Sequence, residues 1–240
     1  MLFDKYIYKL SPEEFYDFLT SYGKGVEVLS EGESFVEFAL YEPVKGLKPV
    51  KVIKVEIIKP EKVYRPIRVK NLMVLPSWIK PVVIRQGGAF GTGLHESTRL
   101  CLGLLQEELK PGWSVLDVGT GTGILAIASK RLGADRVLAI DIDPVAVEEC
   151  RYNAEENCVE IECLLGEPKD VRESFDLLVA NLELDIFRHL WSKMERLFKH
   201  TAIVSGLYGK ESVREFLSLC GLKPAKIRSL KNWYGLVLRI

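Results

Sequence analysis

Two acidic residues and one amide follow short apolar runs in the second half of this 240-residue sequence. Asp117 precedes a glycine cluster at 119–123, Asp141 ends the next apolar run, and Asn181 ends a later one. Glycines let the backbone approach a ligand closely, and carboxylates accept hydrogen bonds from ribose hydroxyls. An amide carbonyl can hold an amine. These residues therefore predict a small-molecule site at the carboxyl edge of a parallel sheet.

The glycine cluster is compatible with two ligand classes. From Gly121 it follows the G-x-G-x-x-A pattern of dinucleotide sites, which is a weak signal alone. From Asp117 it follows D-x-G-x-G-x-G, which resembles the first motif of class I methyltransferases, where the acid lies near the methionine ammonium. A cationic sulfonium has no pyrophosphate to bind, so the acid favours S-adenosylmethionine. Asp141 would bind ribose hydroxyls in either case and does not discriminate.

Asn181 closes the run Asp176-Leu-Leu-Val-Ala-Asn181. Many amino-group methyltransferases place Asn or Asp here, with carbonyl oxygens that hold the reacting nitrogen. The alternative is a cap for the helix that we expect from Leu184. Together with the acids and the glycine cluster, the pattern favours a catalytic Asn181.

The elements around these residues alternate between strand and helix after Glu96. Runs such as VLAI and TAIVSGL do not alternate in polarity, so they predict strands covered on both faces of a doubly wound parallel sheet. Lys231-Asn232 predicts a hairpin turn that makes one late strand antiparallel. The predicted strands are Ser114 to Val118, Arg136 to Ile142, Ile161 to Leu165, Asp176 to Leu182, Thr201 to Leu207, Pro224 to Leu230 and Trp233 to Ile240, and the predicted helices are Ser97 to Leu109, Gly123 to Leu132, Pro144 to Asn157, Leu184 to Lys199 and Lys210 to Leu219.

A small α+β domain is expected over residues 1–58. Ser11-Pro12-Glu13-Glu14 combines an N-cap serine, a proline at the first helical position and a glutamate three residues after the cap, which predicts a helix start. The predicted strands of this domain are Lys5 to Leu10, Val26 to Leu29, Ser34 to Leu40 and Val50 to Ile58. Residues 59–81 are rich in proline and basic residues and predict an extended connector, with the main domain at 82–240.

Composition limits the alternatives. Lys plus Arg and Asp plus Glu are both 33, so no global charge attracts nucleic acid or an acidic membrane.

The five cysteines show no metal-ligand spacing and predict buried thiols in a reducing cytosol, and we expect no bound metal. Neither a signal peptide nor a stretch of about 18 apolar residues is present, so we expect a cytoplasmic protein.

Four segments, in this order and spacing, carry a likeness to a known family: IRQGGAFGTGLHESTRLCL, VLDVGTGTGILAIASKRLGA, AIDIDPVAVEECRYNAEEN and FDLLVANLELD. They resemble the bacterial ribosomal protein methyltransferase PrmA family, which modifies protein eleven of the large ribosomal subunit. The block A-F-G-T-G-x-H-x-[ST]-T is more specific than either glycine pattern. The likeness is strong over residues 72–240.

This resemblance implies a Rossmann-like class I methyltransferase sheet behind a small substrate-recognition domain. It implies that S-adenosylmethionine is the cofactor and that lysine ε-amines and the N-terminal α-amine of the ribosomal protein are the targets. The residues carried over as cofactor contacts are Phe90, Thr92, Thr98, Asp117, Gly119, Gly121, Asp141 and Asn181, and Asn181 would also lie beside the reacting amine. Phe90, Gly91, Thr92 and His95 would form a loop over the methionine end.

His95 invites a second interpretation as a general base. We favour a role in loop structure, with Glu96 and the pair Ser97-Thr98 as caps of the following helix. We expect a monomer whose partner is a large-subunit ribosomal protein, with no stable nucleic-acid complex and no membrane association. The alternatives are a methyltransferase with another protein or small-molecule target, an NAD-dependent oxidoreductase, and a non-catalytic ribosome-binding module.

Overall fold

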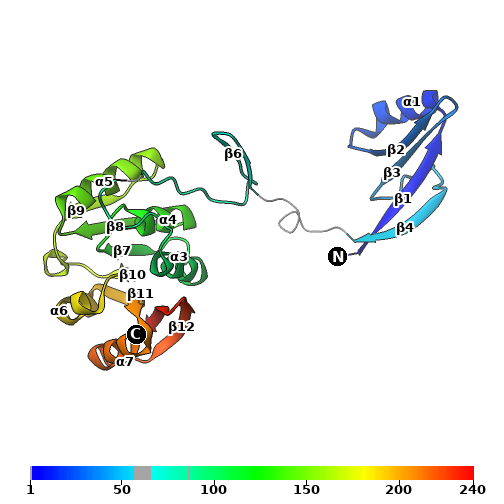
Figure 1. Cartoon of the computed structure of the whole chain (residues 1–240). Helices are drawn as coiled ribbons and strands as arrows, with labels where there is room; N and C mark the ends of the chain where they lie inside the picture. The colour runs from blue at the N-terminus through cyan, green and yellow to red at the C-terminus, as the bar shows by residue number, and fades with distance from the viewer. Residues whose placement is uncertain (1, 57–65, 86) are drawn as a thin grey trace. The chain divides into compact units, whose positions relative to one another are not determined.

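The computed structural model describes residues 2–56, 66–85 and 87–240, and the chain divides into two compact units, Met1–Ile79 and Lys80–Ile240. Figure 1 traces both units, and each is described here by itself. The predicted connector, 59–81, lies partly outside the described residues.

The first unit is a four-stranded antiparallel sheet with one helix, in the strand order β2-β3-β1-β4. Its elements are β1 (Leu2–Leu10), α1 (Pro12–Tyr22), β2 (Glu27–Gly32), β3 (Phe35–Leu40) and β4 (Lys51–Glu56). The predicted capping box is present, because Glu14 N–H donates to Ser11 Oγ while Ser11 N–H donates to the Glu14 carboxylate. Tyr8, Phe15 and Phe38 pack between α1 and the sheet and form the core of this unit.

A second hairpin lies in the described part of the predicted connector. Strands β5 (Ile67–Val69) and β6 (Leu72–Val74) pair antiparallel across a turn in which Lys70 has a φ of 51°. The sequence analysis did not predict this pairing, in which the apolar run from Leu72 pairs with Ile67–Val69.

The second unit contains a seven-stranded sheet in the order β12-β13-β11-β10-β7-β8-β9. Its strands are β7 (Ser114–Val118), β8 (Arg136–Asp141), β9 (Glu162–Leu165), β10 (Phe175–Asn181), β11 (Phe198–Tyr208), β12 (Pro224–Leu230) and β13 (Trp233–Arg239). Its helices are α3 (Glu96–Glu108), α4 (Ile124–Leu132), α5 (Pro144–Glu156), α6 (Leu184–Met194) and α7 (Gly209–Cys220), with short 3-10 turns at Pro168–Asp170 and Glu195–Leu197. Strands β7 to β11 run parallel, and β13 is antiparallel to both β11 and β12.

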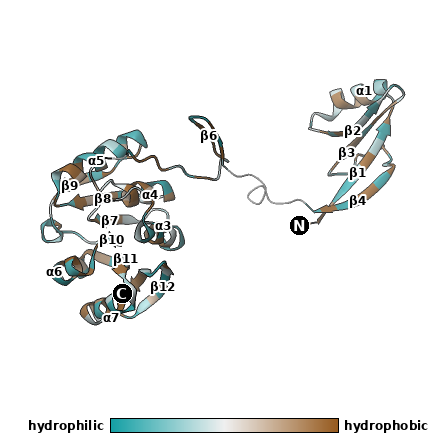
Figure 2. Ribbon diagram, in the orientation of Figure 1, coloured by the Kyte–Doolittle hydropathy of each residue, from teal (hydrophilic) through white to brown (hydrophobic). Residues whose placement is uncertain are grey.

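Helices cover both faces of this sheet, which confirms the predicted doubly wound fold. On β10, Leu177 and Val179 pack toward α3, α4 and α5, whereas Leu178 and Ala180 pack toward α6 and α7. Because successive side chains of a strand alternate between faces, a strand covered on both must be apolar throughout. Figure 2 shows the apolar residues in brown, and α4 carries more of them than α5.

The predicted helix from Leu184 to Lys199 is too long. Helix α6 ends at Met194, and Phe198 already begins β11, where it pairs with Phe175 and is buried. Burial of Phe198 in the sheet therefore ends the helix earlier than local periodicity indicates.

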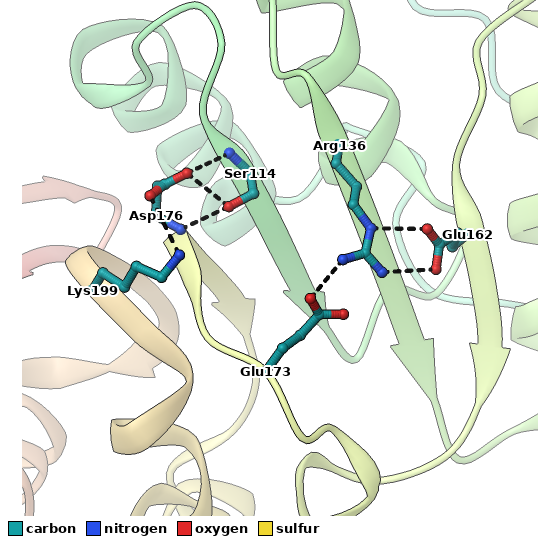
Figure 3. Close-up of polar contacts among 6 residues, drawn as sticks. All are labelled: Ser114, Arg136, Glu162, Glu173, Asp176 and Lys199. Carbon is teal, nitrogen blue, oxygen red and sulfur yellow. Dashed lines mark hydrogen bonds and ion pairs between the residues drawn. The ribbon is translucent and has the colours of Figure 1, made fainter.

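The amino edge of the sheet is held by polar contacts among the first residues of its strands (Figure 3). Arg136 makes two hydrogen bonds to the Glu162 carboxylate, at 2.9 and 3.1 Å, and a third to Glu173 at 2.7 Å. Asp176 accepts from Ser114 N–H at 2.8 Å, and this bond is the main cause that lowers the pKa of Asp176. These contacts fix strand register at the edge opposite the predicted site.

The cysteines differ from the prediction of five buried thiols. Cys150 on α5 and Cys163 on β9 form a disulfide, and Cys158 is exposed. Cys101 and Cys220 are buried thiols, as expected.

Candidate functional site

A cavity of about 510 Å³ lies at the carboxyl edge of the parallel strands of the second unit. The ends of β7, β8 and β10 line it, together with the loop before α3 and the start of β13. Ligands of open α/β sheets bind at this edge. Five predicted site residues line the cavity: Phe90, Gly119, Gly121, Asp141 and Asn181. The other three, Thr92, Thr98 and Asp117, are not part of the lining formed by the described residues.

The glycine turn after β7 follows a path that only glycine can take. Gly119 and Gly121 have φ angles of 73° and 54°, in the left-handed region. A Cβ added to Gly121 would collide with the carbonyl oxygen of Phe90, and one added to Gly119 would collide with the side chain of Leu182. The turn is therefore packed tightly between the loop before α3 and the residues that follow β10. The cavity lies against both glycines.

Asp117 is completely buried beneath this turn. Its Oδ2 accepts hydrogen bonds from Thr120 Oγ1 at 2.7 Å and from Ala126 N–H at 3.1 Å, while Oδ1 has no partner among the described residues. Burial raises the pKa of Asp117 to about 7. The side chain supports the turn and the start of α4, and its predicted place beside a ligand ammonium stays a prediction.

Asp141 ends β8 at the cavity wall. Its Oδ2 accepts from Gly121 N–H at 3.0 Å, and its Oδ1 accepts from Asp143 N–H at 3.0 Å. A carboxylate has about four lone-pair sites, so these two bonds orient it and leave acceptor capacity for ligand hydroxyls. Ile142, 72% exposed, and Pro168 provide apolar surface beside it. This end of the cavity fits an adenosine group.

Asn181 and Thr98 meet at the other end of the site. The Asn181 Nδ2 donates to Thr98 Oγ1 at 3.2 Å, and Thr98 is buried near the start of α3. The Asn181 Oδ1 is buried and has no partner among the described residues, although Asn181 lines the cavity. A buried acceptor without a partner is costly, and a ligand that donates a hydrogen bond to it would remove the cost. Thr98 therefore does not line the cavity itself but orients Asn181, which does.

The loop before α3 is bonded to the glycine turn. Thr122 N–H donates to Phe90 O at 3.0 Å, and Thr122 Oγ1 donates to Gly91 O at 2.7 Å. His95 is the N-cap of α3, because its Nδ1 accepts from Ser97 N–H at 3.3 Å. The predicted structural role of His95 is thus supported, but Glu96 and Ser97 are helical residues and not the cap.

Helix α5 fixes the same loop through residues that the sequence analysis did not select. Glu149 accepts from Gly88 N–H at 2.6 Å and from Ala89 N–H at 3.2 Å. Asn153 Oδ1 accepts from Arg85 N–H at 2.9 Å, and Asn157 Oδ1 accepts from Val83 N–H at 2.8 Å. The spacing of these polar residues could have indicated a shared contact, because residues 149, 153 and 157 are four apart and therefore lie on one face of a helix.

Trp233 is a second residue that the sequence analysis did not select. It begins β13 after the hairpin turn, pairs with Tyr208 at the end of β11 and lines the cavity. Its ring contacts the His95 ring, with centroids 4.6 Å apart. No sequence motif marks Trp233, since only the antiparallel return of β13 brings it to this edge.

Within residues 2–56, 66–85 and 87–240, no group of three or more His, Cys, Asp or Glu side chains is placed to hold a metal ion. None of the helices described there is long and apolar enough to cross a membrane.

Comparison with known proteins agrees with this geometry. A model of the family "Ribosomal protein L11 methyltransferase (PrmA)" matches residues 57–240. The chain is 47% identical over 241 residues to a ribosomal protein L11 methyltransferase of Aquifex aeolicus, which covers 99% of this chain and 98% of the relative. It is 41% identical over 196 residues to the enzyme of that name from Caldicellulosiruptor saccharolyticus, covering 75% of this chain and 64% of the relative.

A solved structure is also similar. The crystal structure of ribosomal protein L11 methylase from Lactobacillus delbrueckii subsp. bulgaricus superposes with a TM-score of 0.60 at 28% identity, covering 73% of this chain and 98% of that one. Both the sequence and the fold relationships thus extend over the sheet that carries the cavity. The chain belongs to the ribosomal protein L11 methyltransferase family.

Proposed function

We propose that this chain transfers methyl groups from S-adenosylmethionine to amino groups of ribosomal protein L11, at lysine ε-amines and the N-terminal α-amine, with Asn181 beside the reacting nitrogen. The observation that carries this proposal is the Asn181 amide. Its Nδ2 is bonded to Thr98, and its Oδ1 is buried with no partner in the part of the chain that the structure describes, although Asn181 lines the cavity. An amine that donates one N–H to Oδ1 would satisfy this acceptor.

The residues of the cavity fit the cofactor. Asp141 and the apolar residues beside it suit a ribose and an adenine, and the backbone of the glycine turn borders the cavity at Gly119 and Gly121. When bound, S-adenosylmethionine supplies an electrophilic methyl carbon, whose bond to sulfur breaks as the bond to nitrogen forms. Phe90 and Gly119 would line the middle of the site, and Thr98 would act through Asn181.

The target nitrogen must be neutral to attack. A lysine with a pKa of about 10.4 is neutral at pH 7 in only about one molecule in a few thousand. Desolvation next to a cationic sulfonium lowers that pKa, so no strong base is needed. A neutral amide at position 181 orients the amine without stabilising its protonated form. Alignment by the site can contribute up to about 7 to 11 kcal/mol.

His95 is not the base in this proposal. Its Nδ1 is engaged at the start of α3, 2.7 Å from Ser97 Oγ and 3.3 Å from Ser97 N. These contacts support a role in loop structure.

The remaining proposals concern the partner. We propose that the small α+β domain predicted over residues 1–58 contributes to recognition of the ribosomal protein. We also propose that the enzyme acts as a monomer, without a stable nucleic-acid complex, in the cytoplasm, where its substrate is made. The zero formal net charge supports the absence of a nucleic-acid partner.

Two measurements test the proposal. In a thermal-shift assay, S-adenosylhomocysteine at 100 times its Kd should add about 2.7 kcal/mol of stability, whereas NAD should add none. Stabilisation by NAD alone would support the oxidoreductase alternative instead. Mass spectrometry of large-subunit proteins incubated with enzyme and cofactor should then show methylation of L11, and methylation of a different protein would change the target.

A further inference from the structure

Four rings from three segments form a chain, here called the aromatic corner: Phe90, His95, Trp233 and Tyr208. The first three line the cavity, and Tyr208 contacts the ring of Trp233. The centroid distances are 5.4 Å between Phe90 and His95, 4.6 Å between His95 and Trp233, and 5.1 Å between Trp233 and Tyr208. The interplanar angles are 67°, 70° and 63°, so each ring meets the next edge to face. Such a series presents ring faces in several directions around a concave wall.

The backbone holds the corner in place. Tyr208 and Trp233 are directly paired between β11 and β13. A hydrogen bond from Gly209 N–H to Asn232 O, at 2.8 Å, joins the hairpin turn before Trp233 to the residue that follows β11. Lys231 in the turn also forms an ion pair with Glu96 at 2.8 Å, which ties the turn to the start of α3. Two rings of the corner thus lie on strands and a third on a helix cap.

The corner lies on the same cavity as the proposed amine site. Phe90, His95, Trp233 and Asn181 all line that cavity, and Glu183 adds a negative charge to its lining. Phe90 is 58% exposed and Tyr208 is 57% exposed, so both rings are accessible. The His95 ring is held in this wall by contacts of its Nδ1 with Ser97, at 2.7 Å from Oγ and 3.3 Å from the backbone N.

We propose that the aromatic corner binds the methylated ammonium group of the target, with Trp233 as its main contact. This inference rests on the proposed function. The faces of aromatic rings attract cations, and quaternary ammonium groups are bound in this way because they cannot donate hydrogen bonds. Each methyl group added to the target nitrogen removes an N–H that Asn181 could bind. Contact with the corner then replaces contact with Asn181, so a partly methylated amine stays in the site.

The first test measures binding without turnover. The probes are the N-acetyl amide of Nε-trimethyllysine and its neutral analogue, in which carbon replaces the quaternary nitrogen. Both are titrated by NMR into full-length protein saturated with S-adenosylhomocysteine. Trp233→Leu should weaken binding of the charged probe about tenfold, Trp233→Phe should recover most of that affinity, and the neutral analogue should bind weakly to all three proteins.

Two further variants keep this test decisive. Tyr208→Leu changes an exposed ring and should weaken the charged probe about threefold, even if Trp233→Leu fails to fold. Trp113→Leu is the matched control, because Trp113 immediately precedes β7 at the opposite edge of the sheet, and it should leave probe affinity unchanged. The proposal would be overturned if every leucine variant that folds bound the charged probe as tightly as wild type does, or if wild type bound both probes with equal affinity.

The second test measures products. L11 is methylated in the presence of excess unlabelled competitor, so that each protein molecule meets the enzyme once, and the methyl states are resolved by mass spectrometry. Tyr208→Leu and Trp233→Leu should shift products toward monomethylated amines. An unchanged distribution would contradict the role of the corner. If wild type bound the charged probe but methylated no site of L11, the proposed function would fail and the binding site would stand.

Discussion

The side-chain amide of Asn181 donates a hydrogen bond to Thr98 Oγ1 over 3.2 Å, and this contact joins residues 83 positions apart in the chain. It connects the end of β10 with the first turn of α3. Because the Nδ2 is fixed, the orientation of the amide is fixed, and Oδ1 is left as the free acceptor. The geometry of the proposed amine site therefore depends on a residue outside the cavity lining.

Thr98→Val should identify this positioning role. Valine keeps the shape of threonine but removes the acceptor, so Asn181 loses the bond that orients it. We expect kcat to fall about tenfold while KM for S-adenosylmethionine changes less than threefold. Thr98→Ser should restore most of kcat. If Thr98 instead contacts the cofactor directly, as the sequence resemblance implies, steady-state kinetics will show the change mainly in KM.

Two substitutions of Asn181 should change the reaction in different ways. Asn181→Ala removes the amine acceptor and should lower kcat about 100-fold, with little loss of S-adenosylhomocysteine affinity. Asn181→Asp should keep an acceptor but stabilise the protonated amine, because a carboxylate favours a nearby positive charge. Its pH–rate profile should therefore shift to higher pH by about one unit or more. Near-normal turnover by the alanine variant would remove Asn181 from the reaction.

Because the pKa of Asp117 is raised in the folded protein, we expect the free energy of unfolding to depend on pH. Its folded-state pKa is raised from 3.8 to about 7, so between about pH 4 and 7 the unfolded chain has lost a proton that the folded protein keeps. The free energy of unfolding therefore falls as pH rises through this window, by up to about 1.4 kcal/mol per unit, and this contribution is constant above pH 7.

The variant Asp117→Asn tests this dependence. Asparagine resembles the protonated acid and cannot ionise, so the stability of wild type relative to the variant should decrease from pH 4 to pH 7. Urea unfolding at several pH values measures the difference. A difference that is constant with pH would show that the folded protein carries an ionised Asp117 throughout this window.

Glu149 should control the order of the loop before α3. Glu149→Ala removes an ionised acceptor from Gly88 N–H and Ala89 N–H. Hydrogen bonds to charged groups contribute about 1.5–3 kcal/mol, so these two amides should exchange with solvent more than tenfold faster. The matched control is Glu148→Ala, which changes the exposed neighbour on the same helix. Equal exchange in the two variants would mean that the remaining contacts suffice to hold the loop.

Many helices and strands of the second unit could be predicted because the residues that bound them lie next to them in the sequence. The strand β7 and the helix α4 are bounded by the glycines at 119–123 and 133, which leave a clear signal in sequence. Asp141 and Asn181 were found because each ends a buried apolar run, and parallel strands bring such ends to one edge. The resemblance to the family added the loop before α3.

Two other features depend on contacts between distant segments. Trp233 reaches the cavity only because β13 returns antiparallel beside β11. Phe198 ended a periodic helix because the sheet buries its ring. In both cases tertiary packing outweighed the local preference. The His95 cap is a local contact with Ser97, two residues away, and was missed because histidine is not among the preferred cap residues.

Gly121 provides a test of the glycine turn itself. Two effects oppose a side chain at this position: a φ of 54°, and the Phe90 carbonyl oxygen, which occupies the place of a Cβ. The first costs an alanine about 1–2 kcal/mol, and the second forces the loop before α3 to move away from the turn. Gly121→Ala should therefore lower affinity for S-adenosylhomocysteine more than tenfold, as measured by calorimetry.

The matched control for Gly121→Ala is Gly112→Ala. Gly112 has a φ of 85°, but a Cβ there would have no neighbour within 4 Å among the described atoms. This variant should lose about 1–2 kcal/mol of stability and keep wild-type affinity. The comparison separates backbone strain from steric conflict. If both variants lost stability equally and both bound S-adenosylhomocysteine normally, contact between the loop and the turn would not be required for the cofactor site.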